Sequence, residues 1–513
     1  MQSFSIYYGY AYASGDLGAF VQILWYAGQW HIPLSSLSYP YDLTTPWLSF
    51  HFSPLIFIFA PLFRLAHFHI EILLVIHVLV VSLVVIPVYA VCRRFGYSRP
   101  GSCVWLVILL CNPFAHYNLT YSLQENTIAM PLFAFAYWTV VTGRKRWFLL
   151  TMLLLLLTKE HMGAAVAGFG LLWGWYHREW GFGWLTALIG IGFFIAVFTA
   201  IMPWFGASIH PMLLGKEAEG FSRYRWIYEP YPQILQVFWA LITHPVNLGY
   251  LGALLGFFLV FPPIAAGIFL LPAGADFLAN YLSELSIPKK PYVYHSANII
   301  VCLVVASAAF LATWCWRKTA LYIQGAICVV ILISFLLYTG RYIQQNAPLF
   351  FRHDMEWAYQ SEARQKASAY LNTLPQEMRV GVQGNVGYFL AKRSNIFPST
   401  SVSPEQVMEM DVFVYRLSPY TVTRASHPVL VPLEQVHMLL NNLDYGVVLW
   451  EDPWIIIQKG KQDIVDKETI RKRVRQIFMH DVMLGIREDP RVLVDRQTTE
   501  SPSAVIPTPS PSQ

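Results

Sequence analysis

The amino-acid sequence predicts a mainly α-helical protein, in which a polytopic bundle of transmembrane helices is followed by a small C-terminal α/β domain. Of its 513 residues, 56% are hydrophobic and only 13% are charged, whereas about a quarter of the residues in a soluble domain are charged. The charges gather late in the chain, because residues 341–513 hold 19 of the 35 Lys and Arg and 19 of the 30 Asp and Glu. This composition excludes a soluble enzyme, a disordered chain and a nucleic-acid-binding protein.

Apolar runs predict about ten membrane spans, since a helix needs roughly 20 apolar residues to cross a bilayer and fewer when its neighbours shield it. Residues 53–66 form a further apolar stretch that Pro54, Pro61 and Arg64 interrupt, which is typical of a short half-inserted helix. Residues 203–245 read as a loop between two spans. The predicted spans are 71–91, 102–117, 126–142, 147–158, 161–177, 183–202, 246–260, 263–280, 296–316 and 319–339.

Basic residues cluster in alternate loops, which predicts that these loops are cytoplasmic. The remaining loops, residues 1–70 and the C-terminal domain then lie on the outer face of the membrane. An N-terminus outside the membrane with no helix before it is unusual, so we expect a further N-terminal span to precede residue 1. The basic loop residues are Arg93, Arg94, Arg99, Arg144, Lys145, Arg146, Arg178, Arg317 and Lys318.

The sequence divides into four regions. We expect residues 1–70 to form an outer-face first loop with amphipathic or half-inserted helices, and residues 71–340 to form the transmembrane bundle. Residues 341–496 form the extracytoplasmic α/β domain, and the Ser- and Pro-rich residues 497–513 form a disordered tail. Inside the α/β domain, helices are predicted at 355–373, 432–443 and 462–478, and strands at 379–383, 411–416, 446–449 and 454–458.

The first loop carries the polar residues best placed for chemistry at the outer membrane surface. Asp16 stands between Gly15 and Gly18 and precedes an amphipathic run over residues 17–30. A carboxylate there can accept a proton from an acceptor hydroxyl, although the spacing alone favours an N-cap of that run. Gln22, Asp42 and His51 are the other polar candidates in this loop.

Three charged residues interrupt apolar helices further along the chain. Glu125 stands where the span at 126–142 begins, a place that the helix dipole alone favours for an acid. Lys159 and Glu160 separate two apolar runs, and charges at membrane depth usually mark a site or an internal pair. We weigh a site, with Lys159 as a point charge for a lipid phosphate, against a mutually paired surface turn.

Arg223 and Arg225 flank Tyr224 and precede Trp226 in the 203–245 loop. Arginines with interleaved aromatic rings suit a phosphate or a sugar ring, and also suit a simple anchor at the membrane interface. No cofactor is certain from the sequence. It contains no dedicated set of metal ligands, so a divalent metal that bridges Asp16 and a phosphate stays open.

Several motifs in order resemble the bacterial membrane-protein family called domain of unknown function 2079. Where that family often has His-Pro-Glu, this chain has Leu123-Gln124-Glu125, so only the acid matches. The resemblance covers most of the chain. Its motifs are Asp16-Leu17-Gly18 with Gln22 and Trp25, His51-Phe52-Ser53-Pro54, Ala60-Pro61-Leu62, Glu125 with Ala129-Met130-Pro131, Lys159-Glu160, Val380-Gly381-Val382, and Tyr445 to Val448 with Trp454.

That family is similar to the GT-C superfamily of membrane glycosyltransferases, which use polyprenyl-phosphate sugars and carry an acid in the first outer loop. The resemblance implies a multi-pass protein of the bacterial inner membrane that transfers a hexose or pentose at the extracytoplasmic face, with inversion. It implies that Asp16 is the matching acidic residue of that loop and the catalytic carboxylate. Lys159, Arg223 and Arg225 are then the candidates for the donor phosphate, and His51, Glu125, Glu160, Asp42 and Gln22 contact the acceptor or support the residues that do.

Two other classes of function remain open at the level of sequence. A transporter or lipid flippase would bury polar residues near the membrane midplane, whereas the polar residues recognised above gather at outer helix ends. A non-catalytic membrane scaffold would use the C-terminal domain to bind a partner protein. The sugar, the acceptor and the oligomeric state are not encoded in any pattern that we recognise.

Overall fold

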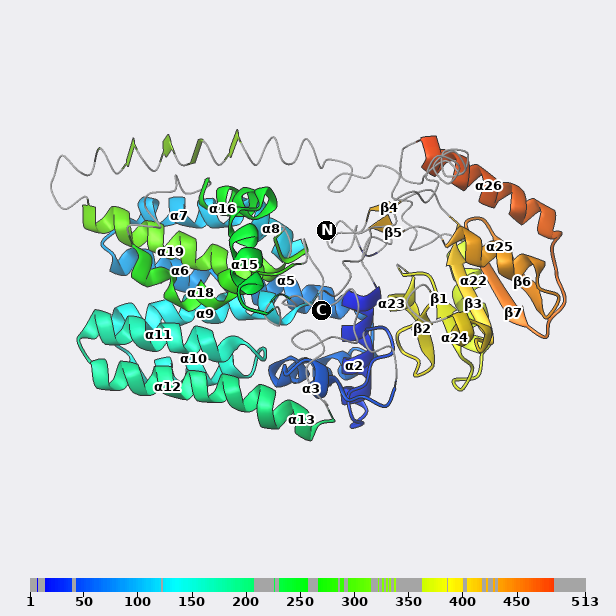
Figure 1. Ribbon diagram of the computed structural model, residues 1–513, viewed down its shortest axis with the longest axis horizontal. Helices are drawn as coiled ribbons and strands as arrows, with labels where there is room; N and C mark the ends of the chain where they lie inside the picture. Colours follow the sequence, from blue (N-terminus) through cyan, green and yellow to red (C-terminus); the bar gives the residue numbers. More distant parts are fainter. Residues whose placement is uncertain are drawn as a thin grey trace, which may run out of the picture.

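The structure is a computed structural model in which a bundle of helices lies beside a small β-sheet that carries its own helices (Figure 1). Between these two parts lie the short helices α2, Ala19–Gly28, and α3, Trp47–Phe50. The structure describes residues 7, 14–38, 43–120, 123–206, 226, 230–256, 266–284, 287–289, 294–314, scattered residues between 322 and 337, and 362–483 apart from 385, 400–403, 418–420, 423–427 and 430–431.

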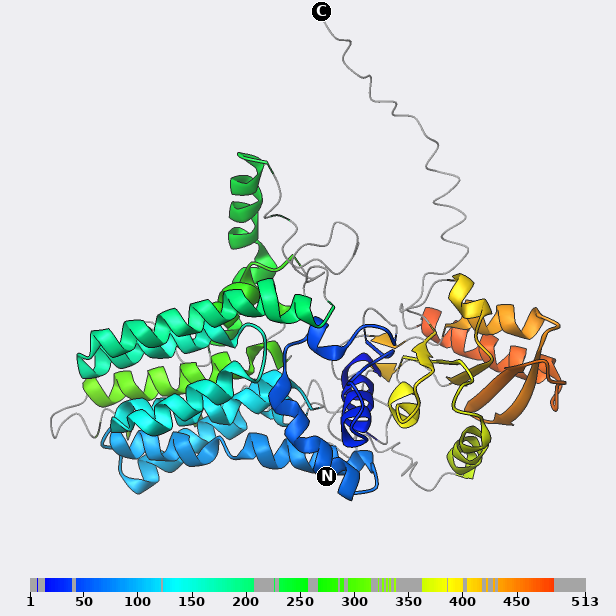
Figure 2. The same ribbon diagram turned by 90° about the horizontal axis from the view of Figure 1, so that it is seen from below.

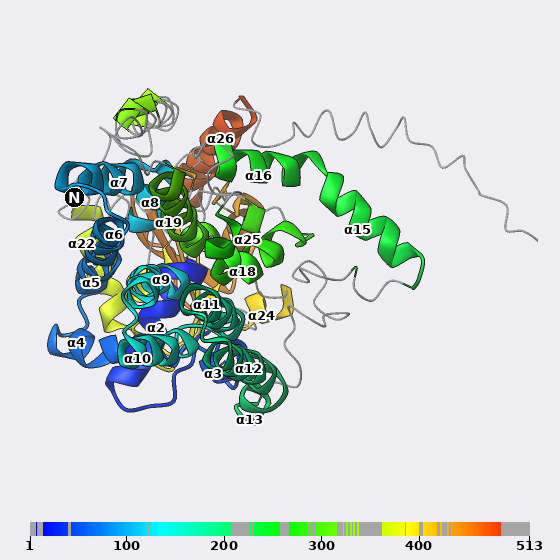
Figure 3. The same cartoon turned by 90° about the vertical axis from the view of Figure 1, so that its left-hand side faces the viewer.

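The helix bundle follows the predicted spans closely up to residue 204. Helix α9 lies in the middle of the bundle, where α5, α6, α10, α11 and α19 all contact it (Figure 3). The bundle helices are α5 Ile70–Ser82, α6 Val85–Arg94, α7 Arg99–Cys111, α8 Pro113–Thr120, α9 Glu125–Thr142, α10 Lys145–Leu156, α11 Met162–His177, α12 Trp180–Ala196, α13 Met202–Trp204, α15 Gln233–Thr243, α16 Pro245–Gly256, α18 Gly274–Tyr281 and α19 Ala297–Trp314.

Three stretches of helix among the described residues are long and apolar enough to cross a membrane, namely Ile70–Arg94, Trp180–Trp204 and Tyr294–Thr313. A fourth span results if α15 and α16, which meet at a bend of 46°, count as one broken span. The other helices are shorter. Helix α10 has 12 residues, about 18 Å of helix, against a hydrocarbon core of about 30 Å. Ten spans therefore stay a prediction, and the span at 319–339 lies mostly outside the described residues.

Residues 203–245 are not simply a loop, so that prediction is wrong for its last part. Helix α15 occupies Gln233–Thr243 and has no buried residues. It projects away from the bundle (Figure 2). The residues of this helix are mostly apolar, and Pro232 is its N-cap, a position where proline interrupts no helical hydrogen bond.

Small residues allow α11 and α12 to pack closely. An added Cβ at Gly163 would lie 2.3 Å from the carbonyl oxygen of Gly190, and one at Gly170 would lie 2.7 Å from that of Gly183. Backbone approach through glycine is the usual way in which membrane helices associate, because lipid provides no hydrophobic force between them. This pair places the 157–161 turn, which precedes α11, at one end of the bundle.

The first segment, by which we mean the described residues before α5 at Ile70, folds into short helices that run between the bundle and the sheet. A π-helical turn, Ser14–Gly18, leads into α2. The predicted interrupted helix at 53–66 is present as a 3₁₀ helix, Pro54–Phe59, joined to α4, Ala60–Leu65. Proline at the first helical turns explains this break into short pieces, because proline lacks the N–H that an interior position needs.

The C-terminal part is a five-stranded mixed sheet in the order β2-β1-β3-β7-β6. Strands β1, β2 and β3 are parallel, whereas β7 runs antiparallel to both β3 and β6. The elements are α22 Glu362–Thr373, β1 Val380–Val382, α23 Gly387–Leu390, β2 Ile396–Pro398, α24 Pro404–Met408, β3 Val412–Arg416, the two-stranded β4 Thr421–Val422 and β5 Pro428–Val429, α25 Leu433–Asn441, β6 Tyr445–Glu451, β7 Trp454–Lys459 and α26 Lys467–Met483.

The two faces of this sheet belong to different cores, as the alternation of side chains along a strand requires. Phe413 and Tyr415 pack with α25 and α26. Val412 and Val414 face the other way and share one core with Phe20 and other residues of the first segment. The C-terminal sheet is thus joined to the first segment by a continuous hydrophobic core.

Candidate functional site

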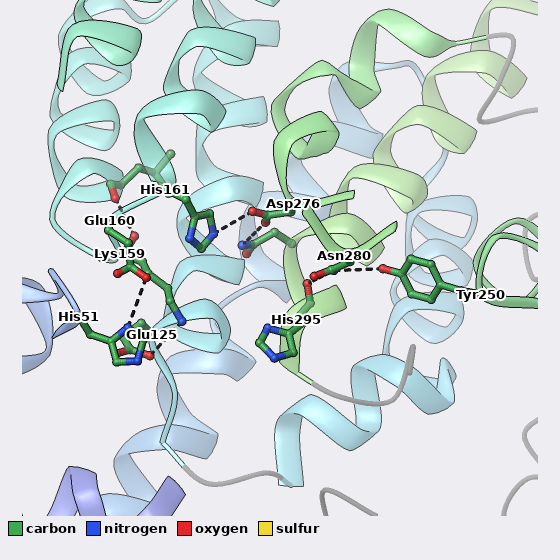
Figure 4. A network of polar contacts seen from close by, with 12 residues as sticks. His51, Glu125, Lys159, Glu160, His161, Tyr250, Asp276, Asn280 and His295 are labelled. Atoms are coloured by element: carbon green, nitrogen blue, oxygen red, sulfur yellow. Dashed lines mark hydrogen bonds and ion pairs between the residues drawn. The ribbon is translucent and has the colours of Figure 1, made fainter. Parts of the chain in front are cut away.

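Three consecutive residues in the turn between α10 and α11 reach three different parts of the chain (Figure 4). Lys159 meets Glu125 at the start of α9, Glu160 meets His51 after α3, and His161 meets Asp276 in α18. The turn separates two apolar helices, and each of its side chains has an ionisable partner. This gathering of charge at one end of the bundle is the candidate functional site.

Lys159 and Glu125 form a buried pair, with Lys159 Nζ 3.7 Å from Glu125 Oε2 and exposures of 7% and 2%. The distance exceeds that of a direct hydrogen bond, so the ammonium keeps donor capacity for a further group. Lys159 Nζ also lies 5.8 Å from the centre of the Tyr294 ring. Glu125 is the first residue of α9, as the sequence indicated, but its partner is Lys159.

Glu160 pairs with His51, whose Nδ1 lies 3.3 Å from Glu160 Oε1. Both residues are largely shielded from solvent. Burial alone would raise the pKa of the Glu160 carboxyl, but the charge and hydrogen bond of His51, with the charges of Lys159 and His161, hold it below its ordinary value. The alternative of a surface turn in which Lys159 and Glu160 pair with each other is therefore wrong.

His161 donates a hydrogen bond from Nε2 to Asp276 Oδ1 at 2.8 Å. The second oxygen of this buried carboxylate accepts a bond of 3.0 Å from Asn298 Nδ2. Asp276 lies in the first turn of α18, where the helix dipole also favours a negative charge. The carboxylate thus has partners on two sides, and it holds the turn to α18 and α19.

A second chain of hydrogen bonds fixes α18 on its other side. Asn280 Nδ2 donates to the carbonyl oxygen of His295 at 3.0 Å and to Tyr250 Oη at 3.1 Å. Tyr250 Oη in turn lies 3.1 Å from Ser296 Oγ. These residues join α16, α18 and the start of α19, so the helix that carries Asp276 is held firmly (Figure 4).

Asp16 approaches the same end of α9 from the first segment. It lies half-buried in the π-helical turn, and Gln124 Nε2 donates to its Oδ1 at 3.4 Å. Gln124 directly precedes Glu125, the partner of Lys159. Asp16 is not the N-cap of α2, because the N-cap is Gly18 and no side chain caps that helix.

The remaining candidates from the sequence fall into two groups. Gln22 donates to the carbonyl oxygen of Arg393 at 2.8 Å and accepts from the backbone N–H of Ser36 at 2.9 Å. It therefore joins the first segment to the C-terminal sheet. Asp42, Arg223 and Arg225 lie outside the described residues.

Two carboxylate oxygens at the site, Glu125 Oε1 and Glu160 Oε2, are buried without a hydrogen-bond partner among the described residues. Buried acceptors of this kind are costly unless a ligand or water supplies a donor. Within the described part of the chain, no group of three or more His, Cys, Asp or Glu is placed to hold a metal ion. We therefore derive no chemical step through a metal.

Sequence reasoning missed Asp276 and its partner Asn298. Asp276 lies within residues 263–280, which we read as one apolar span. An ionisable residue inside a predicted span indicates a functional site or an internal pair, so this signal was present. The hydrogen bond from Gln124 to Asp16 joins residues 108 positions apart, and no local sequence pattern predicts it.

Comparison with known proteins places the chain among membrane proteins. The family model described as "Predicted membrane protein (DUF2079)" matches residues 8–452. A search of curated proteins gave no match.

Two crystal structures of ArnT from Cupriavidus metallidurans are distantly similar in fold. The one bound to undecaprenyl phosphate is 14% identical, with a TM-score of 0.48 over 89% of this chain and 96% of that one. The apo structure is 13% identical, with a TM-score of 0.45 over 88% and 96%.

Proposed function

The chain belongs to the family of predicted membrane proteins described as DUF2079, and we propose that it is an integral-membrane glycosyltransferase. It moves a sugar from a polyprenyl-phosphate donor to an acceptor hydroxyl at the extracytoplasmic face, with inversion. The observation that supports this most is that Asp16, Glu125 and Lys159, far apart in sequence, come together at one end of α9. The reaction needs a carboxylate that accepts the proton of the acceptor hydroxyl and a cation that stabilises the leaving phosphate.

Asp16 is the general base of the proposed reaction. Its carboxylate accepts the proton of the acceptor hydroxyl, and the oxygen attacks the anomeric carbon on the face opposite the phosphate. The new glycosidic bond forms as the bond between the anomeric carbon and the phosphate oxygen breaks. The electron pair leaves with the polyprenyl phosphate, so the configuration at the anomeric carbon inverts.

Lys159 stabilises the leaving phosphate. A polyprenyl phosphate is already acidic, so its departure calls for positive charge more than for a strong general acid. The ammonium of Lys159 is buried and lies 3.7 Å from Glu125 Oε2, which leaves it able to donate to a phosphate oxygen. Arg223 and Arg225, which lie outside the described residues, are proposed from their sequence pattern as further phosphate contacts.

Glu125 and Glu160 are proposed to bind sugar hydroxyls. Each has one buried oxygen without a hydrogen-bond partner among the described residues, and hydroxyl groups are donors that fit such acceptors. His51 holds Glu160 in place through its 3.3 Å contact. Asp42 is proposed as a further acceptor contact, while Gln22 supports the site by joining the first segment to the sheet.

The proposed function includes a membrane topology. We propose a GT-C-like bundle of about ten spans in the bacterial inner membrane, with the α/β part at residues 341–496 outside the cytoplasm. The polar groups that the reaction uses gather at the end of α9 that meets the first segment. That end then lies at the outer surface.

A transfer assay in reconstituted liposomes tests the function. The purified full chain receives a panel of radiolabelled polyprenyl-phosphate sugars and an extract of envelope acceptors. Label should leave the donor with the wild type, and transfer should fall by about a hundredfold or more in Asp16→Asn and Lys159→Met. The matched controls Asp444→Asn and Lys461→Met change exposed residues of the C-terminal sheet and should retain full activity.

Two outcomes contradict the proposal. Full transfer by a folded Asp16→Asn variant removes the role given to Asp16. Transbilayer movement of the lipid without any transfer of its sugar, at every donor in the panel, favours a flippase instead.

A further inference from the structure

A cavity separate from the charged turn lies where the helix bundle meets the C-terminal sheet. Its volume is about 260 Å³, and its walls come from the start of α5, from α22, from α23 and from the first residue of β7. The polar residues that line it are His69, Glu71, Ser368 and Lys392, and the aromatic ones are Tyr7, Phe389 and Trp454.

The aromatic residues that line the cavity are held in position by contacts with one another and by a hydrogen bond. The rings of Tyr7 and Phe389 lie with centroids 4.9 Å apart, and Tyr388 Oη donates to the carbonyl oxygen of Tyr7 at 2.8 Å. Trp454 is 4% exposed. Rigid aromatic faces beside a few polar groups are the usual lining of a small-molecule site. The apolar face of a ring-shaped ligand can lie flat against them.

The charges around the cavity restrict the ligand. Lys392 brings a positive group from the sheet side, and Glu71 brings a negative one from α5, with His69 Nδ1 4.0 Å from its Oε2. Glu71 repels a phosphate or carboxylate, and a purely hydrocarbon ligand would make no hydrogen bond with the polar residues of the lining. A ring with several hydroxyls can bind both charged residues, because each hydroxyl can donate to Glu71 or accept from Lys392 and Ser368.

We infer that this cavity binds the ring of a neutral carbohydrate. The inference stands apart from the proposed transferase activity, because binding alone measures it. The cavity is also connected to the first segment through neighbouring residues of α23. Phe389 of α23 lines it, while the neighbouring Tyr388 packs on the Asp16 turn, where an added Cβ at Gly18 would lie 3.3 Å from Tyr388 Cα.

Equilibrium dialysis of the purified full chain in detergent micelles tests this site. The probes are tritiated glucose, mannose and N-acetylglucosamine, with phosphocholine as the comparison. We expect at least one sugar to bind the wild type. Lys392→Met should weaken that binding by about tenfold, the worth of one hydrogen bond to a charged group. Ser368→Phe, which fills the cavity from an exposed helix position, should abolish it.

The controls are close in place and chemistry. Ala369→Phe adds the same ring one position along α22 at an exposed residue outside the lining, and Lys461→Met removes an exposed lysine elsewhere on the sheet domain. Both should bind like the wild type. The inference is overturned when no sugar binds, when bound sugar is insensitive to both Lys392→Met and Ser368→Phe, or when phosphocholine binds more tightly than every sugar.

Discussion

Asp276 accepts a hydrogen bond of 2.8 Å from His161, and this bond ties the charged turn between α10 and α11 to a helix more than a hundred residues later. The carboxylate is 5% exposed and its other oxygen is held by Asn298. His161 directly follows Lys159 and Glu160. The bond therefore fixes the backbone of the turn from which both of those side chains extend.

We predict that Asp276→Asn and His161→Gln each destabilise the protein, and that their effects are not additive. Residues in one hydrogen-bond network show coupling energies of about 0.5 to 3 kcal/mol, and the partial exposure of His161 at 26% places this pair toward the lower end. A double-mutant cycle on unfolding in mixed micelles measures the coupling. Additive effects of the two substitutions would show that the bond contributes nothing.

Gln22 joins two parts of the chain that lie more than 350 residues apart. Its amide donates to the Arg393 carbonyl and accepts from Ser36, and the residue is fully buried. We predict that Gln22→Ala loosens the contact between the first segment and the sheet by about 1–3 kcal/mol, because it leaves buried partners unpaired. Faster hydrogen exchange at residues 393–396 reports the loss.

Gln29→Ala is the matched control for this prediction. Gln29 follows the same helix α2 but makes only a local bond, from its Nε2 to the carbonyl oxygen of Trp25. Exchange at residues 393–396 should therefore stay as in the wild type. Equal exchange in Gln22→Ala and Gln29→Ala would show that Gln22 does not hold the sheet in place.

Much of the local structure is readable in the sequence, because local patterns specify it. The β-rich runs at 411–416 and 454–458 form β3 and β7, since a short continuous apolar run suits a strand that is covered on both faces. The three residues of β2, Ile396–Pro398, carry too little pattern, and their proline argues against a strand. Helix α15, within the predicted 203–245 loop, was not predicted, although its residues are mostly apolar.

The candidate site is readable only in part, because its contacts are long-range. The sequence singled out His51 in the first loop, and Glu125, Lys159 and Glu160 at the ends of apolar runs. The structure pairs His51 with Glu160 and Lys159 with Glu125 (Figure 4). It did not tell which acid meets which base, since pairing depends on how α3, α9 and α11 pack. Asp276 was overlooked inside a stretch read as apolar, although its charge alone made it unusual there.

Two glycines of α12 offer a direct test of the helix packing. A Cβ at Gly190 would lie 2.4 Å from the carbonyl oxygen of Gly163, whereas one at Gly192 would meet nothing within 4 Å. We predict that Gly190→Ala costs about 1–3 kcal/mol of stability, because it forces α11 and α12 apart. Gly192→Ala should be neutral or gain up to about 1 kcal/mol, since alanine favours a helix.

Thermal unfolding of the two variants in the same detergent compares them directly. A lower unfolding temperature in Gly190→Ala than in Gly192→Ala is the expected order. Equal unfolding temperatures would mean that α11 and α12 do not approach through these glycines.

The Glu160 carboxyl should make stability depend on pH in the acid range. Burial raises its pKa, but His51 and the neighbouring charges outweigh burial, so the pKa in the folded protein lies below the ordinary value of 4.5. A depressed pKa stabilises the folded state at pH above the ordinary value, and this stabilisation is lost as the pH falls toward the folded-state pKa. The unfolding temperature of the wild type should therefore drop as the pH is lowered below about 4.5. Glu160→Gln should flatten this drop, while Glu362→Gln, at a side chain 81% exposed, should follow the wild-type curve. Parallel curves for the wild type and Glu160→Gln would show that the His51 contact does not hold Glu160 ionised.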